Sequence, residues 1–257
     1  MILEGKVAMI TGGGKGIGRV ISQRFARAGA DLVLLARTEE ALEEVANGAR
    51  SLGRRALVFP GDASQEEVVE NAVNQALKTL GHIDILVNNT GIEGPNSPIE
   101  GIARGDWDHT MAVNLTSAFL CCKKVIPFMR SQKQGSIINI SSLAGTRGMI
   151  NRSPYCASKW AMIGMSKAVA WEVGPDDIRV NVICPGAVEG ERIDRVMHKR
   201  ARDHGLTYGE MIAKTTSDTP LRRLVTPEEI AATALFLASD ESSGITGEVM
   251  IVSGGRR

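Results

Sequence analysis

The stretch KVAMI (Lys6–Ile10), followed at once by TGGGKGIG (Thr11–Gly18), decides the fold of this chain of 257 residues. KVAMI is a short apolar run typical of a strand, and the amphipathic stretch Arg19–Gly29 predicts a helix. A second apolar run, DLVLL (Asp31–Leu35), predicts another strand. The glycines therefore lie in a βαβ unit, where they predict a phosphate-binding turn rather than a flexible one.

The glycine loop fits a dinucleotide, although its spacing TGxxxGxG differs from the common GxGxxG. Gly12, Gly16 and Gly18 let the backbone turn sharply and approach a pyrophosphate, which rests on the helix N-terminus. The candidate cofactor-binding residues of this loop are Gly12, Gly14, Lys15, Gly16, Ile17 and Gly18.

A second motif, YCASK, places Tyr155 and Lys159 four residues apart, on one face of a helix. An ammonium near a phenol favours the phenolate and can lower a tyrosine pKa from ~10 toward neutrality. A tyrosine with such a pKa exchanges a proton with a carbonyl or an alcohol near pH 7. Such a pair alone is typical of a solvated helix face. The dinucleotide site on the same chain favours the catalytic interpretation, as does Ser142, thirteen residues before the tyrosine.

Apolar runs and helical runs alternate along the whole chain without a linker or a repeat. The expected strands are 6–10, 31–35, 56–59, 83–88, 136–141, 178–184 and 248–252. The expected helices are 17–29, 39–52, 65–80, 106–132, 155–173 and 226–239. This pattern predicts an α/β fold with a doubly wound, seven-stranded parallel sheet (a Rossmann fold) in one domain, residues 1–257.

The composition limits the partners. A hydrophobic content of 43% is enough for one sizeable core, and a net charge of +1 gives no footprint for nucleic acid. No apolar run approaches the ~18 residues that cross a bilayer, and the start MILEGK has no signal-peptide layout. We therefore expect a cytoplasmic protein without a membrane or nucleic-acid partner.

Cysteines and histidines predict neither disulfides nor a metal site, because they lack CxxC and metal-ligand spacings. The cysteines, expected to be reduced and mostly buried, are Cys121, Cys122, Cys156 and Cys184, and the histidines are His82, His109, His198 and His204.

The glycine loop and YCASK together resemble the short-chain dehydrogenase/reductase family, in its compact single-domain branch. Further motifs follow in the family's order over nearly the whole chain: NNTG (Asn88–Gly91, with Thr90 for the usual alanine), VNL (Val113–Leu115), ISSLAG (Ile140–Gly145) and CPG (Cys184–Gly186). The resemblance implies that Tyr155 is the general acid in reduction and the base in oxidation. Lys159 would lower its pKa and bind the nicotinamide ribose.

The resemblance also implies that Ser142 holds the substrate oxygen and that Asn114 keeps a water in a proton relay. The alternatives are a capping serine and a buried asparagine that bridges backbone groups. Further cofactor contacts are implied at Asp62, which approaches the adenine, and at Ala63, Asn89, Gly91, Pro185, Gly186 and Val188. The family's usual threonine after the PG turn is missing, so the nicotinamide amide contact is lost or is made by the Val188 backbone.

The cofactor choice depends on the end of the second strand. NAD-preferring sites place an acid there for the ribose 2′-hydroxyl, whereas this chain has Ala36 followed by Arg37 and Thr38. Arg37 and Lys15 suit a 2′-phosphate, which predicts NADP(H). The alternative is that Arg37 is a solvated loop charge.

The charged, poorly periodic segment 187–219 predicts a substrate lid or a solvated helical insertion. The helices around 112–129 and 155–173 are apolar on most sides, and the resemblance suggests a homotetramer built on them.

The predicted function is NADPH-dependent hydride transfer between the cofactor and a small-molecule ketone or secondary alcohol. The alternatives are a 3-oxoacyl-(acyl-carrier-protein) reductase and, from another class, an idle NADP-binding sensor or scaffold. Arg130 and Lys133 end one helix, but Asp176 and Asp177 follow the next, which disfavours docking of an acidic carrier.

Overall fold

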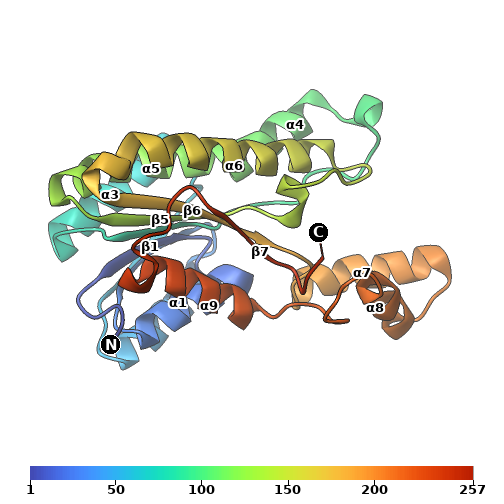
Figure 1. Ribbon diagram of the computed structural model, residues 1–257, viewed down its shortest axis with the longest axis horizontal. Coiled ribbons are helices and arrows are strands. Elements are labelled where there is room, and N and C mark those ends of the chain that lie inside the picture. Colours follow the sequence, from blue (N-terminus) through green and yellow to red (C-terminus); the bar gives the residue numbers. More distant parts are fainter. Residues whose placement is uncertain (257) are drawn as a thin grey trace.

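The computed structural model describes residues 1–256 and contains a seven-stranded, wholly parallel sheet (Figure 1). Its strands are β1 (Val7–Thr11), β2 (Asp31–Ala36), β3 (Ala56–Pro60), β4 (Ile85–Asn88), β5 (Gly135–Ile140), β6 (Ile178–Pro185) and β7 (Val249–Val252). The order β3-β2-β1-β4-β5-β6-β7 changes direction between β1 and β4, where ligands of doubly wound sheets bind. The predicted fold class is confirmed.

Two layers of helices cover the sheet (Figure 1). One core lies under α1 (Gly16–Arg27), α2 (Glu39–Ser51) and α9 (Pro227–Ala238). A second core lies under α3 (Glu66–Leu80), α5 (Ser117–Gln132) and α6 (Ser153–Val173). Because both faces are covered, β1 and β5 are buried along their whole length, as their apolar sequences require.

The helix expected at 106–132 is interrupted. It consists of α4 (Arg104–Met111), a π-helical turn η2 (Ala112–Thr116) and α5, which follow one another without a break. A π turn inserts one residue into the helical repeat and occurs often at functional sites. Here it holds Asn114, whose side chain is completely buried.

The same continuous run, Arg104–Gln132, also has the length and mean hydropathy of a membrane span, with 44% of its most apolar window buried. The sequence expectation differed because it counted only uninterrupted apolar residues. A core helix of a globular domain meets the same test, and α5 packs on the sheet here.

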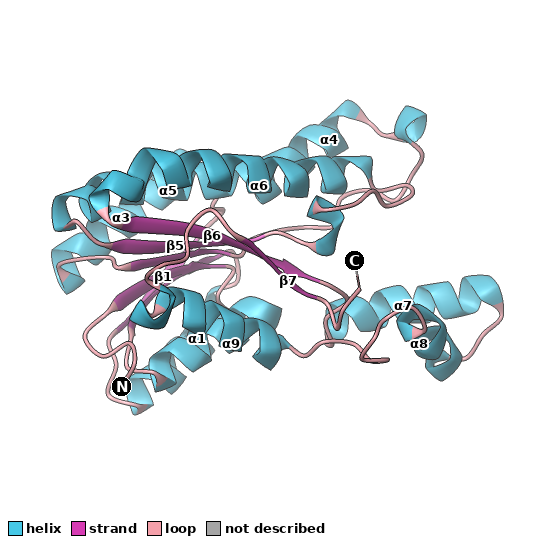
Figure 2. Cartoon of the chain, viewed as in Figure 1, coloured by secondary structure: helices cyan, strands magenta, loops and turns pink. Residues whose placement is uncertain are grey.

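The segment after β6 forms two helices, α7 (Glu191–His204) and α8 (Tyr208–Thr216), which project from the body of the molecule (Figure 2). They pack on each other around a small core of their own, centred on Met197, Ala201 and Met211. The helical character expected for this segment is confirmed, whereas its role as a lid stays a prediction. The remaining short helices are η1 (Ile99–Gly101), η3 (Leu143–Gly145), η4 (Gly174–Asp176) and η5 (Asp240–Ser242).

A buried chain of polar side chains fastens α6 to the sheet. Asn88 of β4 donates from Nδ2 to Asn139 Oδ1 of β5 at 2.8 Å, and Asn139 Nδ2 donates to Ser166 Oγ of α6 at 2.7 Å. Buried polar groups are costly unless they are paired, so these bonds favour one position of the helix over others. Helix α6 carries Tyr155 and Lys159, and its position therefore sets the position of both side chains.

Candidate active site

The glycine loop packs directly on the end of β4. A Cβ at Gly18 would lie 2.2 Å from the carbonyl oxygen of Gly12, and one at Gly12 would lie 2.8 Å from Asn89 Nδ2. Gly16, with φ at +51°, faces open space, where the start of α1 is free to receive a ligand. The loop therefore has the close backbone approach and the open helix N-terminus that a pyrophosphate requires.

Asn89 and Thr11 hold this loop against the segment after β4. Asn89 Nδ2 donates to the carbonyls of Thr11 and Gly12 at 3.1 and 3.2 Å. Thr11 Oγ1 accepts from the backbone N–H groups of Asn89 and Thr90 at 3.0 and 3.1 Å. The sequence analysis indicated Asn89 as a site residue but not Thr11. Thr11 could have been found because it is the first residue of the motif TGGGKGIG.

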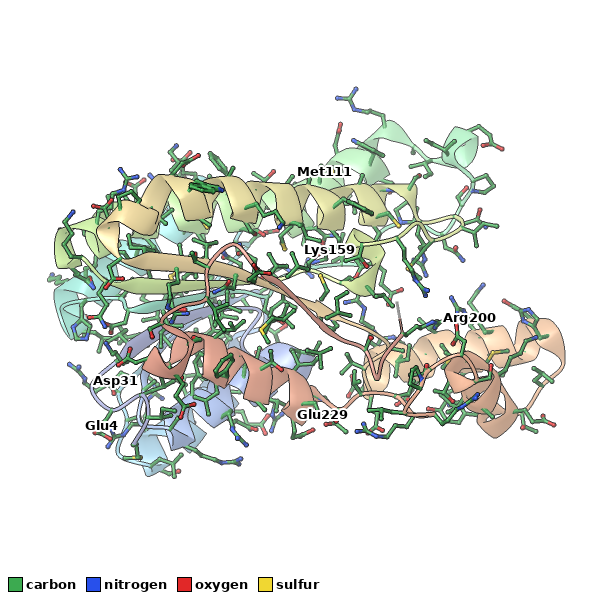
Figure 3. All side chains as sticks on the ribbon, in the orientation of Figure 1. Glu4, Asp31, Met111, Lys159, Arg200 and Glu229 are labelled. Atoms are coloured by element: carbon green, nitrogen blue, oxygen red, sulfur yellow. The ribbon has the colours of Figure 1, made fainter. Side chains whose placement is uncertain are left out.

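Lys159 is buried between α6 and the sheet, with 4% of its surface exposed (Figure 3). Its ammonium donates to the carbonyl of Ile140, at the end of β5, at 2.9 Å. Burial, helped by the positive charge of Arg192, lowers the pKa of Lys159 to about 7. A buried cation with one protein acceptor keeps donors for a hydroxylated ligand.

Gly91 brings Asn114 and Lys159 together. A Cβ at Gly91 would lie 3.3 Å from both Asn114 Oδ1 and Lys159 Nζ. Asn114 Oδ1 accepts from the Ile92 N–H at 2.7 Å, and its Nδ2 donates to the Ile92 carbonyl and to Ser158 Oγ, each at 3.0 Å. Asn114 thus makes the backbone bridge considered as its alternative role, directly beside the lysine.

Ser142 precedes the short helix η3, and Tyr155 lies in the first turn of α6. Ser142 Oγ accepts from the Ala144 N–H at 3.1 Å, so it does cap η3, and its own proton remains available to another acceptor. Short helix η3 packs on α6, where the partly exposed Tyr155 ring has its centroid 6.0 Å from Lys159 Nζ. The four expected catalytic residues therefore gather around the carboxyl ends of β4 and β5.

The residues expected at the adenosine end follow β1, β2 and β3: Lys15 lies in the glycine loop, Arg37 and Thr38 follow β2, and Asp62 and Ala63 follow β3. Lys15, Arg37 and Thr38 are exposed, whereas Ala63 is buried. Burial raises the pKa of Asp62, but hydrogen bonds from Ser64 and the charge of Arg37 outweigh it and keep that pKa below its ordinary value. The positive charge of Arg37 therefore acts on Asp62, the residue expected to lie near the adenine.

The turn after β6 packs against the residue that follows β7. Gly186 passes so close to Ser253 that a Cβ would lie 2.8 Å from the Ser253 Cα. Val188 pairs with Val225 in a parallel bridge, whose bonds use the Ala187 carbonyl and the Glu189 N–H. In such a bridge the N–H and carbonyl of Val188 point away from Val225, as a contact to a ligand amide would need.

The sequence indicated Arg192 as one of several basic residues of the segment 187–219, but not its place beside Tyr155 or its pairing with Glu93. The guanidinium carbon of Arg192, in the first turn of α7, lies 6.0 Å from the Tyr155 ring centroid. Arg192 Nε donates to Glu93 Oε1 at 2.7 Å, and Arg152 lies 3.5 Å from Glu93 Oε2. Arg192 and Glu93 are 99 positions apart, so no local pattern could reveal the pair.

Comparisons with known proteins agree with this geometry. A family model described as enoyl-(acyl carrier protein) reductase matches residues 12–257. The 3-oxoacyl-[acyl-carrier-protein] reductase FabG of Thermotoga maritima is 36% identical over 255 residues, which cover 99% of each chain. The structure of NAD+-bound xylitol dehydrogenase has a TM-score of 0.93 and 31% identity, and the match covers 99% of this chain and all of that one.

L-sorbose reductase from Gluconobacter frateurii, solved with NADPH and L-sorbose, also has a TM-score of 0.93. It is 32% identical, and the match covers 99% of this chain and 98% of that one. The two solved structures thus hold different nicotinamide cofactors.

The buried lysine predicts a pH dependence of stability. Its pKa is about 7 in the folded protein against an ordinary value of 10.5, so between these pH values the unfolded chain binds a proton that the folded chain lacks. Raising the pH through this window therefore increases the free energy of unfolding, by about 1.4 kcal/mol per unit at most, and below pH 7 the full cost of the buried cation is present.

Urea denaturation of the natural protein and of Lys159→Met, near pH 7 and near pH 9.5, measures this effect. As the pH rises, the free energy of unfolding of the natural protein is expected to increase more than that of the variant. Equal pH dependence of the two proteins would contradict a depressed lysine pKa.

Proposed function

We propose that this chain, which belongs to the short-chain dehydrogenase/reductase family, interconverts a small-molecule ketone and its secondary alcohol with NADP(H). It is an oxidoreductase of the CH–OH group by its family. The observation that carries the proposal is the placement of the buried Lys159 between the Tyr155 ring and Asn114, next to Gly91 in the segment that follows β4.

Each catalytic side chain has a separate task. In reduction Tyr155 donates its phenolic proton to the carbonyl oxygen, and in oxidation it removes the proton of the alcohol. Ser142 donates a hydrogen bond to the same oxygen and stabilises the charge that develops on it. The Lys159 cation lies beside the phenol ring, and Asn114 fixes the segment around Ile92 next to that cation.

The residues present fit a nicotinamide dinucleotide. The loop Gly12–Gly18 would hold the pyrophosphate, and Asp62 and Ala63 would flank the adenine. Lys159 would bind the ribose near the nicotinamide, and the Val188 backbone would bind the amide. When bound, the nicotinamide supplies or accepts the hydride.

The 2′-phosphate form is favoured by charge. Lys15 and Arg37 are both exposed, and the strand end that would carry an acid for a 2′-hydroxyl carries Ala36. Arginine and lysine bind phosphate well, whereas an acid would repel it.

A 3-oxoacyl-(acyl-carrier-protein) reductase is the second candidate, because relatives of that name align along the whole chain. Docking of an acidic carrier needs free basic residues near α5 and α6. Here Arg130 lies 3.2 Å from Asp176, and Lys133 also contacts Asp176. Asp176 offsets part of the positive charge of these two residues, which weighs toward a free small molecule. The intact tyrosine, lysine and serine weigh against an idle sensor or scaffold.

A homotetramer, located in the cytoplasm, completes the proposal. The outer sides of α5 and α6 expose large aromatic side chains, namely Phe119, Phe128, Trp160 and Trp171. Trp171 is 85% exposed, and aromatic residues gathered in this way are typical of subunit interfaces.

Replacing Tyr155 by Phe tests the chemistry, because only the proton donor is lost. In a screen of ketones and aldehydes followed by NADPH absorbance, we expect the rate to fall by about 100-fold or more. NADPH binding, measured by fluorescence titration, is expected to change little. Activity within about tenfold of the natural protein would refute the assignment.

Replacing Arg37 by Asp tests the cofactor choice. The natural protein is expected to favour NADPH over NADH by about tenfold or more in kcat/KM, as charge-assisted hydrogen bonds to the phosphate imply. The variant should lose or reverse this preference. Arg27→Asp, on the exposed end of α1, makes the same charge change away from the loop and should preserve it. Equal use of both cofactors by the natural protein would contradict the proposal.

Light scattering at micromolar concentration tests the assembly. We expect the mass of four chains for the natural protein and a smaller mass for Trp171→Glu, because a charge would be buried in the interface. A monomeric natural protein would show that the exposed aromatic residues serve another purpose.

A further inference from the structure

We propose that Arg192 and Arg152 form an anion-recognition site beside Tyr155 and that the substrate is a small oxo acid. Its carboxylate would bind these arginines while its carbonyl meets the phenol. This inference rests on the proposed function and adds the chemical class of the substrate to it.

The position of Arg192 supplies the first argument. Its guanidinium carbon lies 6.0 Å from the centroid of the Tyr155 ring. A carbonyl that receives the tyrosine proton must lie about 3 Å from the phenolic oxygen. A group one or two carbons from that carbonyl is therefore within reach of the guanidinium. The Arg192 side chain is 51% exposed, so a ligand can approach it from solvent.

The balance of charge supplies the second argument. Glu93 lies between the two arginines, with its Oε1 2.7 Å from Arg192 Nε and its Oε2 3.5 Å from Arg152. Within residues 1–256, Glu93 is the one carboxylate paired with either of them. Two cations thus share one anion next to the reacting group, and one positive charge is left in excess.

This charge is partly removed from water. Arg152 is only 16% exposed, and Arg192 is close enough to contribute to the lowered pKa of Lys159. Positive charge in such surroundings interacts more strongly than on an open surface.

The chemistry of the arginine fork selects the ligand. A guanidinium presents several N–H donors in one plane, which match the two oxygens of a carboxylate. The contact with Glu93 runs through Nε of Arg192, and the guanidinium also hydrogen-bonds the Tyr155 side chain. A guanidinium has five N–H donors, so donors are left for a ligand that binds beside the phenol. A neutral ketone would leave the excess charge uncompensated, whereas a carboxylate would neutralise it.

The experiment compares acids with their neutral esters. With NADPH as reductant, kcat/KM is measured for 3-oxobutanoate and 2-oxobutanoate and for the methyl ester of each. The natural protein is expected to favour at least one acid over its ester by about tenfold or more, which corresponds to one charge-assisted pair. In Arg192→Met that ratio is expected to fall by about tenfold. Because the ratio is taken within one protein, general damage to the variant cancels.

Arg195→Met is the matched control. Arg195 lies on the same helix and is exposed, and within residues 1–256 it has no ion pair in the structure. Its acid-to-ester ratio should equal that of the natural protein. Arg152→Met is a second test and should lower the ratio as Arg192→Met does.

The outcomes separate this inference from the proposed function. Equal use of acid and ester, or a ratio that Arg192→Met leaves unchanged, overturns the anion site and leaves Arg192 as an ion pair that holds α7 to the body. Reduction of other ketones but of none of these four compounds overturns the oxo-acid inference while carbonyl reduction stands. Failure to reduce any ketone or aldehyde removes the proposed function itself.

Discussion

The buried ammonium of Lys159 is the interaction on which the rest of the site depends. Taking a cation out of water costs several kcal/mol unless polar partners replace the lost hydration. The protein provides the Ile140 carbonyl and closes the surroundings tightly. A Cβ at Gly145 would lie 2.8 Å from the Lys159 carbonyl oxygen, and Ser141 Oγ donates to that same oxygen at 2.9 Å. These contacts fix the backbone of Lys159, and its ammonium lies so close to Gly91 that a Cβ there would be 3.3 Å from Nζ.

The site is divided between a rigid part and a separately packed part. Tyr155, Lys159 and Ser142 lie on α6 and at the end of β5, which the chain Asn88–Asn139–Ser166 joins to the sheet. Arg192 lies on α7, which belongs to a helix pair with its own core. The proposed catalytic positions thus belong to the main fold, while the position proposed to meet the substrate carboxylate belongs to an appended element. Such a division lets one fold serve many substrates.

The parts that the sequence predicted correctly share a local pattern. The apolar strands, the place of the glycine loop between β1 and α1, and the shared helix of Tyr155 and Lys159 each depend on a short stretch of sequence, where spacing reports directly on geometry. The π turn at Asn114 was not predicted, because the apolar pattern of 106–132 continues through it. The contacts of Glu93 with Arg192 and Arg152, and of Thr11 with Asn89, depend on which loops the sheet order brings together. Charged and hydroxyl residues in loops carry no periodicity, so only the folded chain reveals their partners.

Lys159 and Arg192, the two cations near Tyr155, differ in burial and in how firmly they hold their proton. Burial lowers the pKa of Lys159 to about 7, so its charge varies with pH around neutrality and responds to whatever binds beside it. A guanidinium keeps its proton in proteins and is weakly hydrated, so the half-exposed Arg192 side chain stays charged. Water and salt weaken the field of an exposed charge much more than that of a buried one. Both cations therefore lie beside the phenol, the lysine from a buried position and the arginine through a direct contact, and only the arginine is also accessible from solvent.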